Sequence, residues 1–231
     1  RSIGGAGYIG SHMVKVAHLA GHSVVTLDNL STGHRDAVLH GEFENCDLLN
    51  TKKLDSLFKK YKPDAVMHFG AFSLVGESMT EPNKYYQNNV FGTLNLLNAM
   101  IENNCLKFVF SSSASVYGDP EYIPIDERHP KKPINPYGKS KLMVEEILKD
   151  FDTAYGLKFV SFRYFNAAGH DPDGELSERH NPETHLIPNI LKAARGKNES
   201  VSIFGVENDT KDGTCIRDYI HVNDIADAHL L

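Results

Sequence analysis

The sequence predicts an α/β protein built on a doubly wound parallel sheet, followed by part of a smaller C-terminal region. Short apolar segments alternate with amphipathic ones along most of the 231 residues. A glycine-rich turn at residues 4–10 stands directly before a helix-like segment. Of all residues, 41% are hydrophobic and 23% are charged, as in an ordinary globular protein. Strands that alternate with helices over short links are typical of a parallel sheet covered on both faces.

The individual elements follow from local patterns. The predicted strands are short apolar runs at residues 23–27, 65–69, 107–110 and 157–162. The predicted helices cover residues 54–61, 82–103 and 136–155; the first has amphipathic spacing and the other two begin with proline. From residue 166 the alternation stops, and the next twenty residues are polar. We therefore expect a first domain at residues 1–165 and an incomplete second region at residues 166–231.

Composition and charge limit the partners. Lys+Arg 24 and Asp+Glu 30 give a net charge of −6, which does not favour a nucleic-acid partner, because such binding relies on a basic face. The longest segment without charged residues, Tyr85–Ile101, contains four asparagines, so no membrane partner is expected either. Three cysteines without a C-x-x-C motif indicate a reducing, cytoplasmic compartment.

The two ends suggest a piece of a longer protein. Only Arg1–Ile3 precede the glycine-rich turn, and the chain ends at Leu231 within a helix predicted to begin after Asn223. We expect a chain that is shortened at both ends.

The glycine-rich turn predicts a dinucleotide site. Gly4, Gly7 and Gly10 follow the pattern G-x-x-G-x-x-G, and glycine lets the backbone approach a pyrophosphate at the start of the next helix. Asp28 lies 18 residues after Gly10, where a carboxylate binds the adenosine ribose and repels a 2′-phosphate. NAD is therefore predicted rather than NADP. Alternatively, Asp28 is only a turn residue, and Asp47 either reaches the adenine ring or caps a helix.

A tyrosine and a lysine predict acid–base chemistry. Tyr137 and Lys141 are spaced i, i+4, so they share one helix face. A nearby ammonium, together with a positive nicotinamide ring, is expected to lower the pKa of the tyrosine and make it a base. Ser113 follows a predicted strand, where ligands bind in doubly wound sheets. A surface pair and a helix cap are the alternative interpretations.

The 12 histidines do not predict a metal site. His18 and His22 are separated by a helix-ending glycine, His180 and His185 flank Pro182, and no H-E-x-x-H motif occurs. We expect solvated or structural histidines and no metal.

Taken in order, these motifs resemble the extended short-chain dehydrogenase/reductase family, and within it the epimerases that invert C4 of UDP-hexoses. The matching strings are residues 4–12, 27–30, 75–78, 88–90, 111–118, 136–143, 163–166 and 217–222. The resemblance implies a Rossmann-type fold and the interconversion of UDP-glucose and UDP-galactose with tightly bound NAD. Tyr137 would move the proton of the sugar 4-hydroxyl, and Ser113 would hydrogen-bond that oxygen.

The resemblance also implies which residues line each site. The NAD contacts are Gly4, Gly7, Tyr8, Ile9, Gly10, Asp28, Asn29, Leu30, Ser31, Thr32, Gly33, Asp47, Leu48, Phe69, Gly70, Ala71, Phe72, Ser73, Asn88, Ser113, Tyr137, Lys141 and Phe165. The UDP-hexose contacts are Ser113, Tyr137, Asn166, His185, Leu186, Phe204 and Arg217. A homodimer through helices 82–103 and 136–155 is implied as well.

The chain departs from the family pattern in three places. Ser2 and Ile3 stand where relatives have Val-Thr, and Ser73 replaces a lysine, which should weaken the NAD contacts. The family also continues beyond Leu231, with residues that complete the nucleotide and sugar pocket.

Three other functions stay open. A UDP-N-acetylhexosamine 4-epimerase shares every motif present. A nucleotide-sugar dehydratase needs an acidic residue beside Ser113, where this chain has Ala114 and Ser115. A catalytically silent NAD-binding or nucleotide-binding scaffold would not need Tyr137 and Lys141.

Overall fold

The computed structural model describes residues 2–231 and contains one six-stranded parallel sheet. Its strands are β1 Ser2–Ile3, β2 Val25–Asp28, β3 Glu42–Asn45, β4 Val66–His68, β5 Lys107–Ser111 and β6 Lys158–Phe162. The strands lie in the order β3-β2-β1-β4-β5-β6, so the chain crosses over between β3 and β4. The prediction of a doubly wound sheet is confirmed, and the short β1 still pairs with both of its neighbours.

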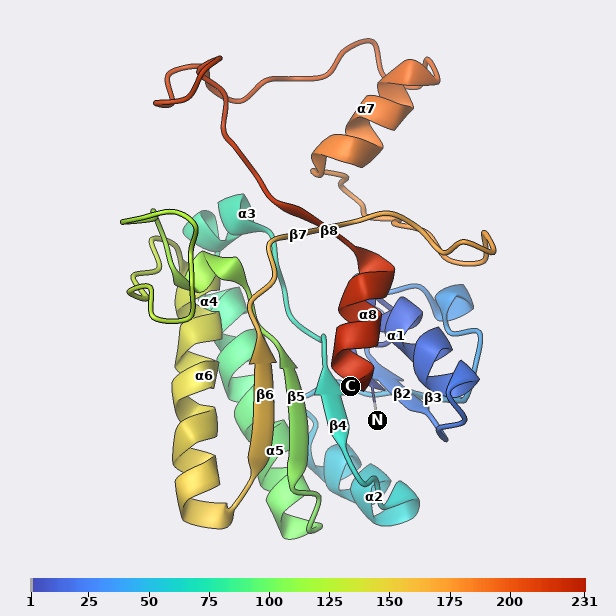
Figure 1. Ribbon diagram of the computed structural model, residues 1–231. Helices are drawn as coiled ribbons and strands as arrows, with labels where there is room; N and C mark the ends of the chain where they lie inside the picture. The colour runs from blue at the N-terminus through green and yellow to red at the C-terminus, as the bar shows by residue number, and fades with distance from the viewer. Residues whose placement is uncertain (1) are drawn as a thin grey trace.

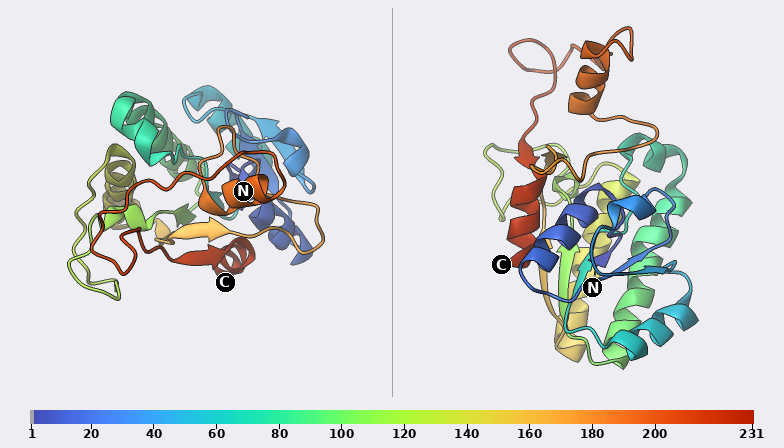
Figure 2. Two further views of the ribbon diagram at one scale, coloured as in Figure 1. Left: turned by 90° about the horizontal axis from the view of Figure 1, so that it is seen from above. Right: turned by 90° about the vertical axis from the view of Figure 1, so that its right-hand side faces the viewer.

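Helices cover both faces of the sheet (Figures 1 and 2). They are α1 Tyr8–Leu19, α2 Thr51–Tyr61, α3 Val75–Thr80, α4 Pro82–Tyr85, α5 Gly92–Glu102, α6 Pro136–Tyr155, α7 Leu186–Ala194 and α8 Val222–Leu230. Two 3₁₀ turns, η1 Arg35–Ala37 and η3 Ala114–Val116, and a π turn, η2 Tyr86–Phe91, complete the structure. On one face α2, α5 and α6 pack side by side, and on the other α1 packs against α8.

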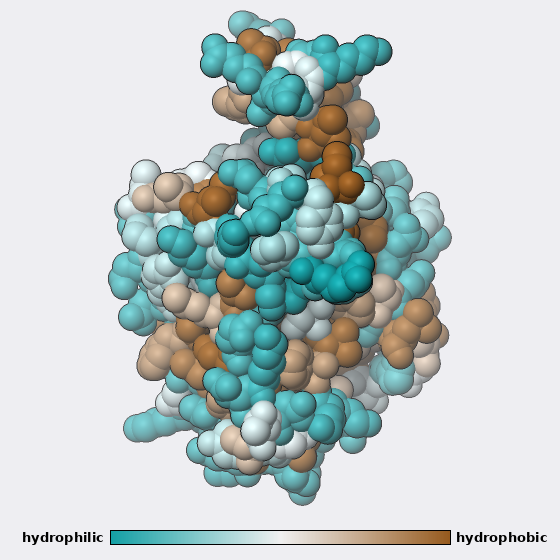
Figure 3. Space-filling view, turned by 60° about the vertical axis from the view of Figure 1, so that its left-hand side comes forward, coloured by the Kyte–Doolittle hydropathy of each residue, from teal (hydrophilic) through white to brown (hydrophobic). Residues whose placement is uncertain are grey.

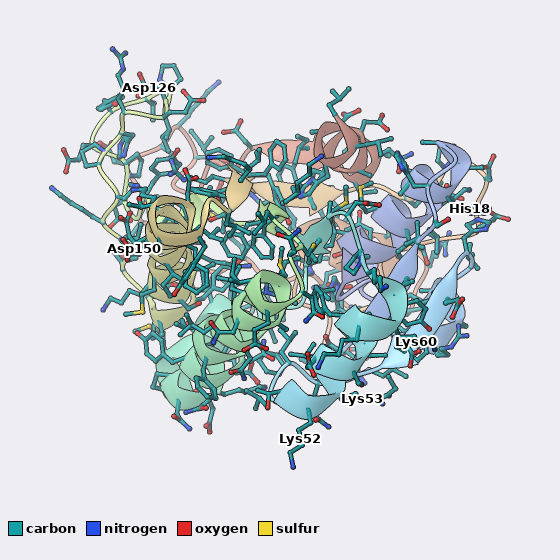
Figure 4. All side chains as sticks on the ribbon, turned by 90° about the horizontal axis from the view of Figure 1, so that it is seen from below. His18, Lys52, Lys53, Lys60, Asp126 and Asp150 are labelled. Atoms are coloured by element: carbon teal, nitrogen blue, oxygen red, sulfur yellow. The ribbon has the colours of Figure 1, made fainter. Side chains whose placement is uncertain are left out.

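The main core lies between the sheet and the layer of α2, α5 and α6. In α2 the apolar residues Leu54, Leu57 and Phe58 are buried, as their spacing predicts. Each such side chain contributes about 1.5–3 kcal/mol by leaving water. Lys52, Lys53 and Lys60, which Figure 4 labels, are exposed or partly exposed on α2, and the Lys60 ammonium pairs with Glu44 of β3 at 2.8 Å. The Asn50 side chain caps α2 by accepting a bond from the Lys53 N–H.

The predicted helix 82–103 is interrupted by the π turn η2. The side chain of Asn89 in this turn accepts a bond from the Phe72 N–H at 3.0 Å and donates to the Phe72 carbonyl at 3.0 Å. It also donates to the Ser140 hydroxyl of α6 at 3.1 Å. A π turn adds one residue to the helical ladder and so reorients the side chains next to it. Here it ties the loop after β4 to the face of α6 that carries Ser140.

Residues 166–221 stand above the carboxyl edge of the sheet (Figure 1). Strands β7 Asn166–Ala168 and β8 Tyr219–His221 form a separate parallel pair. Helix α7 has no buried residue, and its apolar side chains give part of the brown surface of the projecting portion in Figure 3. After β8 the chain returns, because Ala226 of α8 packs against Met13 and Ala17 of α1. In the described part of the chain, no helix is both long and apolar enough to cross a membrane.

Candidate active site

The glycine-rich turn closes tightly against the neighbouring loop. Gly4 has a φ of +75°, and a Cβ there would lie 2.5 Å from the Gly70 nitrogen. A Cβ on Gly10 would lie 2.2 Å from the Gly4 carbonyl oxygen. Only glycine fits at these two positions. Gly7 precedes α1 without a side chain to cap it, so the first N–H groups of the helix are left for an anionic ligand.

Asp28 stands at the end of β2 and is nearly buried. Its carboxylate accepts the Ala6 N–H at 3.0 Å and the Leu30 N–H at 2.8 Å. Burial raises the pKa of this carboxyl group, and the two backbone bonds oppose that change. Each carboxylate oxygen accepts two bonds. Asp28 therefore fixes the turn and keeps acceptor capacity for a ribose.

The residues expected to contact NAD gather along the carboxyl edge of the sheet. Most lie in the turns that follow the six strands, and the remaining contacts come from the end of β2, the first turn of α1, η2 and α6. Within this set Asn29 donates to Asp47 at 2.8 Å, which joins the loops after β2 and β3. The close backbone approach at Gly4 and Gly10 and the acceptor at Asp28 fit a dinucleotide. NAD would be held by these turns.

Tyr137, Lys141 and Ser113 meet where β5 ends. The Lys141 ammonium donates to the Ser111 carbonyl at 2.7 Å and lies 5.8 Å from the centroid of the Tyr137 ring. The Ser113 hydroxyl hydrogen-bonds the Tyr137 phenol and also accepts the Ser115 N–H at 3.1 Å. Asn135 caps α6 by accepting the Gly138 N–H, which fixes the first turn that carries Tyr137.

Burial determines the charge state of this group in the chain without NAD. Burial raises the pKa of Tyr137, while its hydrogen bond from Ser113 opposes the rise. Burial also lowers the pKa of Lys141 to about 7, against the nearby charge of Glu145. The Lys141 ammonium bonds the Ser111 carbonyl. The expected lowering of the tyrosine pKa needs the ammonium together with a bound nicotinamide ring, so it stays a prediction.

A buried ion pair lies behind the catalytic group, and the sequence pattern did not identify it. Glu145, one turn after Lys141, has a side chain only 3% exposed. It accepts two bonds from the Arg163 guanidinium, at 2.8 and 2.7 Å, and one from the Ser112 hydroxyl at 2.7 Å. Arg163 also donates to the Tyr117 hydroxyl at 2.9 Å. The i, i+4 spacing from Lys141 was the only available signal for Glu145.

The residues expected to bind the UDP-hexose are less closely grouped. Asn166 lies in β7 and donates to the Asp218 carbonyl, whereas Arg217 is exposed beside β8. His185 and Leu186 stand at the start of α7. Phe204 is 91% exposed in the projecting loop. The structure thus gathers Ser113 and Tyr137 with the NAD edge but leaves the other five spread over residues 166–217.

Comparisons with known proteins agree with this geometry. The model of the NAD dependent epimerase/dehydratase family matches residues 3–231. The chain is 52% identical over 230 residues to a UDP-glucose 4-epimerase from Lacticaseibacillus casei, covering 99% of this chain and 70% of that protein. A crystal structure of UDP-glucose 4-epimerase from Brucella ovis in complex with NAD is similar with a TM-score of 0.96 and 50% identity, covering 99% of this chain and 70% of that one. The enzyme of that name from Bifidobacterium longum, in complex with NAD+ and UDP, gives a TM-score of 0.95 at 36% identity, covering 99% and 72%.

The family match covers nearly the whole described chain, and it includes the glycine-rich turn as well as the Ser113, Tyr137 and Lys141 group. The chain belongs to the NAD dependent epimerase/dehydratase family.

Proposed function

We propose that this chain interconverts UDP-glucose and UDP-galactose by inverting C4 of the hexose with NAD as cofactor. The observation that carries the proposal is the meeting of Tyr137 and Ser113 at the end of β5, beside the dinucleotide turn. The high identity to proteins named UDP-glucose 4-epimerase supports the same reaction.

The residues divide the proton chemistry between them. Tyr137 takes the proton of the sugar 4-hydroxyl and later returns it to the same oxygen. Ser113 hydrogen-bonds that oxygen and the phenol, so it keeps the two aligned. Lys141, on the same face of α6, would donate to the ribose hydroxyls of the cofactor. NAD, when bound, would supply the acceptor and donor for the hydride at C4. Inversion of the carbon would require the sugar to present its other face before the hydride is returned.

The remaining site assignments are part of the proposal. NAD is held by the turns after the six strands, as the sequence expectation has it. The residues of the region 166–231 that contribute to UDP-hexose binding are Asn166, His185, Leu186, Phe204 and Arg217, and the Arg217 guanidinium suits the diphosphate. A cytoplasmic location is supported by the three cysteines without a C-x-x-C motif.

We also propose a homodimer through η2, α5 and α6. An apolar groove runs between η2 and α6, lined by Val90, Pro133, Lys139, Leu142, Met143, Glu146 and Ile147. Phe91 and Met143 are about half exposed beside it. Figure 3, which brings the side of α6 forward, shows apolar surface in the middle of this face. A contiguous apolar face of this kind suits a second copy of the chain.

Tyr137→Phe should abolish most turnover and leave NAD binding intact. Loss of a positioned acid–base group costs about 10²–10⁴-fold in rate. We would follow UDP-galactose, and separately UDP-N-acetylgalactosamine, by NMR with no NAD added, and then measure the NAD released on denaturation. Tyr155→Phe on the same helix is the control, because Tyr155 is exposed. Near-normal turnover of Tyr137→Phe would disprove the base assignment.

Asp28→Asn should weaken the preference for NAD over NADP. The change keeps one of the two oxygen acceptors that bond the turn and removes the charge that repels a 2′-phosphate. We expect the ratio of the two dissociation constants to shift by about tenfold, or 1.4 kcal/mol, in a binding titration. Asp64→Asn, at an exposed position, should not change the ratio. An unchanged ratio for Asp28→Asn would contradict the ribose role.

Lys141 should make the stability of the NAD-free protein rise with pH. The pKa of its ammonium is 10.5 when unperturbed and about 7 when buried in the fold. Above pH 7 the unfolded state binds more protons than the folded state, so the free energy of unfolding increases by up to about 1.4 kcal/mol per pH unit. Lys141→Met should remove this increase in urea unfolding between about pH 7 and 9. Equal slopes for both proteins would refute a buried neutral lysine.

Met143→Glu should shift the dimer toward monomer. A charge in the apolar groove costs desolvation in each of two symmetric copies. Light scattering coupled to size exclusion would measure the mass. Leu19→Glu, at a 70% exposed position on the opposite face, is the control. A dimer of unchanged stability in Met143→Glu would place the interface elsewhere.

A further inference from the structure

Four potential metal ligands converge in the segment between β7 and α7. Glu178, His180, Glu183 and His185 each offer one ligand atom, and these atoms lie within 4.8 Å of one another. We call these four residues the 178–185 cluster. The chemistry proposed above uses none of its carboxylates.

The spacing of the donor atoms suits a tetrahedral ion. The Nδ1 atoms of His180 and His185 lie 3.1 and 3.0 Å from Glu178 Oε1. Oε1 of Glu183 is hydrogen-bonded to the Nδ1 atom of His185 at 2.8 Å, and Oε2 of Glu183 lies 3.8 Å from the Nδ1 atom of His180. Ligands about 2.0–2.1 Å from a tetrahedral zinc ion are separated by about 3.3 Å. The four separations between histidine nitrogens and carboxylate oxygens, 2.8–3.8 Å, lie on both sides of this value.

Two atoms of the cluster are buried without a hydrogen bond. Glu178 Oε1 and His180 Nδ1 have no hydrogen-bond partner among the described residues, although they are only 3.1 Å apart. The Glu178 side chain is 9% exposed and that of Glu183 is 4% exposed. The 3.1 Å contact between Glu178 Oε1 and His180 Nδ1 therefore lacks the angles of a hydrogen bond. This is expected where the lone pairs of both atoms point toward a common centre. Two buried carboxylates need positive charge beside them, which either protonated imidazole or a bound cation supplies.

We propose that the 178–185 cluster is a structural Zn²⁺ site, with the Nδ1 atoms of both histidines and one oxygen of each glutamate as ligands. Imidazole and carboxylate together suit Zn²⁺, whereas Mg²⁺ and Ca²⁺ take oxygen ligands. Four protein ligands leave no open position, so the role is structural rather than catalytic. The expectation that these histidines have no metal role was made from H-E-x-x-H spacing, and the pattern here, E-x-H-x-x-E-x-H, lies in a loop.

A nearby acidic cluster differs from the 178–185 cluster because it is paired with a lysine. The carboxylates of Asp171, Asp173 and Glu175 also lie close together, but the Lys15 ammonium is 2.7–2.8 Å from all three. That cluster already contains its cation. The 178–185 cluster has histidine nitrogens where the other has an ammonium.

The proposed metal site lies between the dinucleotide turn and the start of α7. The ring of His180 packs edge-on against that of Tyr8, with the centroids 6.1 Å apart, next to the dinucleotide turn. His185 is the residue before α7. A metal bound by both histidines fixes the start of α7 against the NAD edge. The Nδ1 atom of His185 then has a role other than the substrate contact that the resemblance implied.

Metal binding by the full chain tests the proposal without using activity. Protein treated with a chelator and desalted should retain one equivalent of added Zn²⁺, counted by mass spectrometry of the metal. His180→Gln and Glu183→Gln should each weaken Zn²⁺ binding by more than about 100-fold, because even loss of an outer partner costs about 10–100-fold. His22→Gln, which removes an exposed histidine, is the matched control and should bind like the wild type.

Co²⁺ provides a second measurement that needs no variant. In wild-type protein it should give the intense visible bands of tetrahedral coordination, and Zn²⁺ should displace it. Retention of less than one equivalent of Zn²⁺, equal binding by wild type and both cluster variants, or an octahedral Co²⁺ spectrum would overturn the proposal. The NAD released from each variant on denaturation checks that it is folded, so loss of metal is distinguished from loss of the fold.

Discussion

The ion pair between Glu145 and Arg163 holds together α6 and the ends of β5 and β6, beside the proposed catalytic residues Ser113, Tyr137 and Lys141. Glu145 belongs to α6, Arg163 follows β6, and the Ser112 hydroxyl that also bonds Glu145 lies at the end of β5. A buried ion pair is costly to break, by about 3–5 kcal/mol, because the remaining charge is left in a poor solvent. Ser113 and Tyr137 come from β5 and α6, so their separation depends on this pair. The carboxylate also keeps the ammonium of Lys141 from losing its proton completely.

The sequence predicted those parts of the site that local rules determine. The glycine-rich turn needs glycine because neighbouring backbone atoms occupy the positions where a Cβ would lie. The spacing of the glycines in the sequence already indicates this requirement. Tyr137 and Lys141 share a helix face by spacing alone. By contrast, Asn89 and Arg163 act through partners 51 and 18 residues away, at Ser140 and Glu145. No periodicity records such contacts, so only the fold could identify them. The break in helix 82–103 escaped prediction for the same reason.

Burial determines the charge states of Tyr137 and Lys141 in the chain without NAD. Spacing on a helix places two groups on one side, but their pKa values depend on what surrounds them. In the folded chain both groups are removed from water, so each shifts toward its neutral form. A neutral tyrosine is poorly suited to proton removal by itself. Positive charge from a bound nicotinamide would favour the phenolate, so Tyr137 is expected to act as a base only with the cofactor in place.

The segment between β7 and α7 is anchored to the NAD edge at several independent points. Lys15 of α1 bonds Asp171 and its neighbours, and Arg179 pairs through both its terminal nitrogens with Asp36. The imidazole of His34 contacts the Arg179 carbonyl at 2.8 Å. These contacts reach from the turns that would hold NAD to the start of α7, which would hold the sugar nucleotide. This polar loop therefore connects the turns that would hold NAD with the start of α7. In the sequence it is visible only as the point where strands and helices stop alternating. The 178–185 cluster lies at the α7 end of the loop.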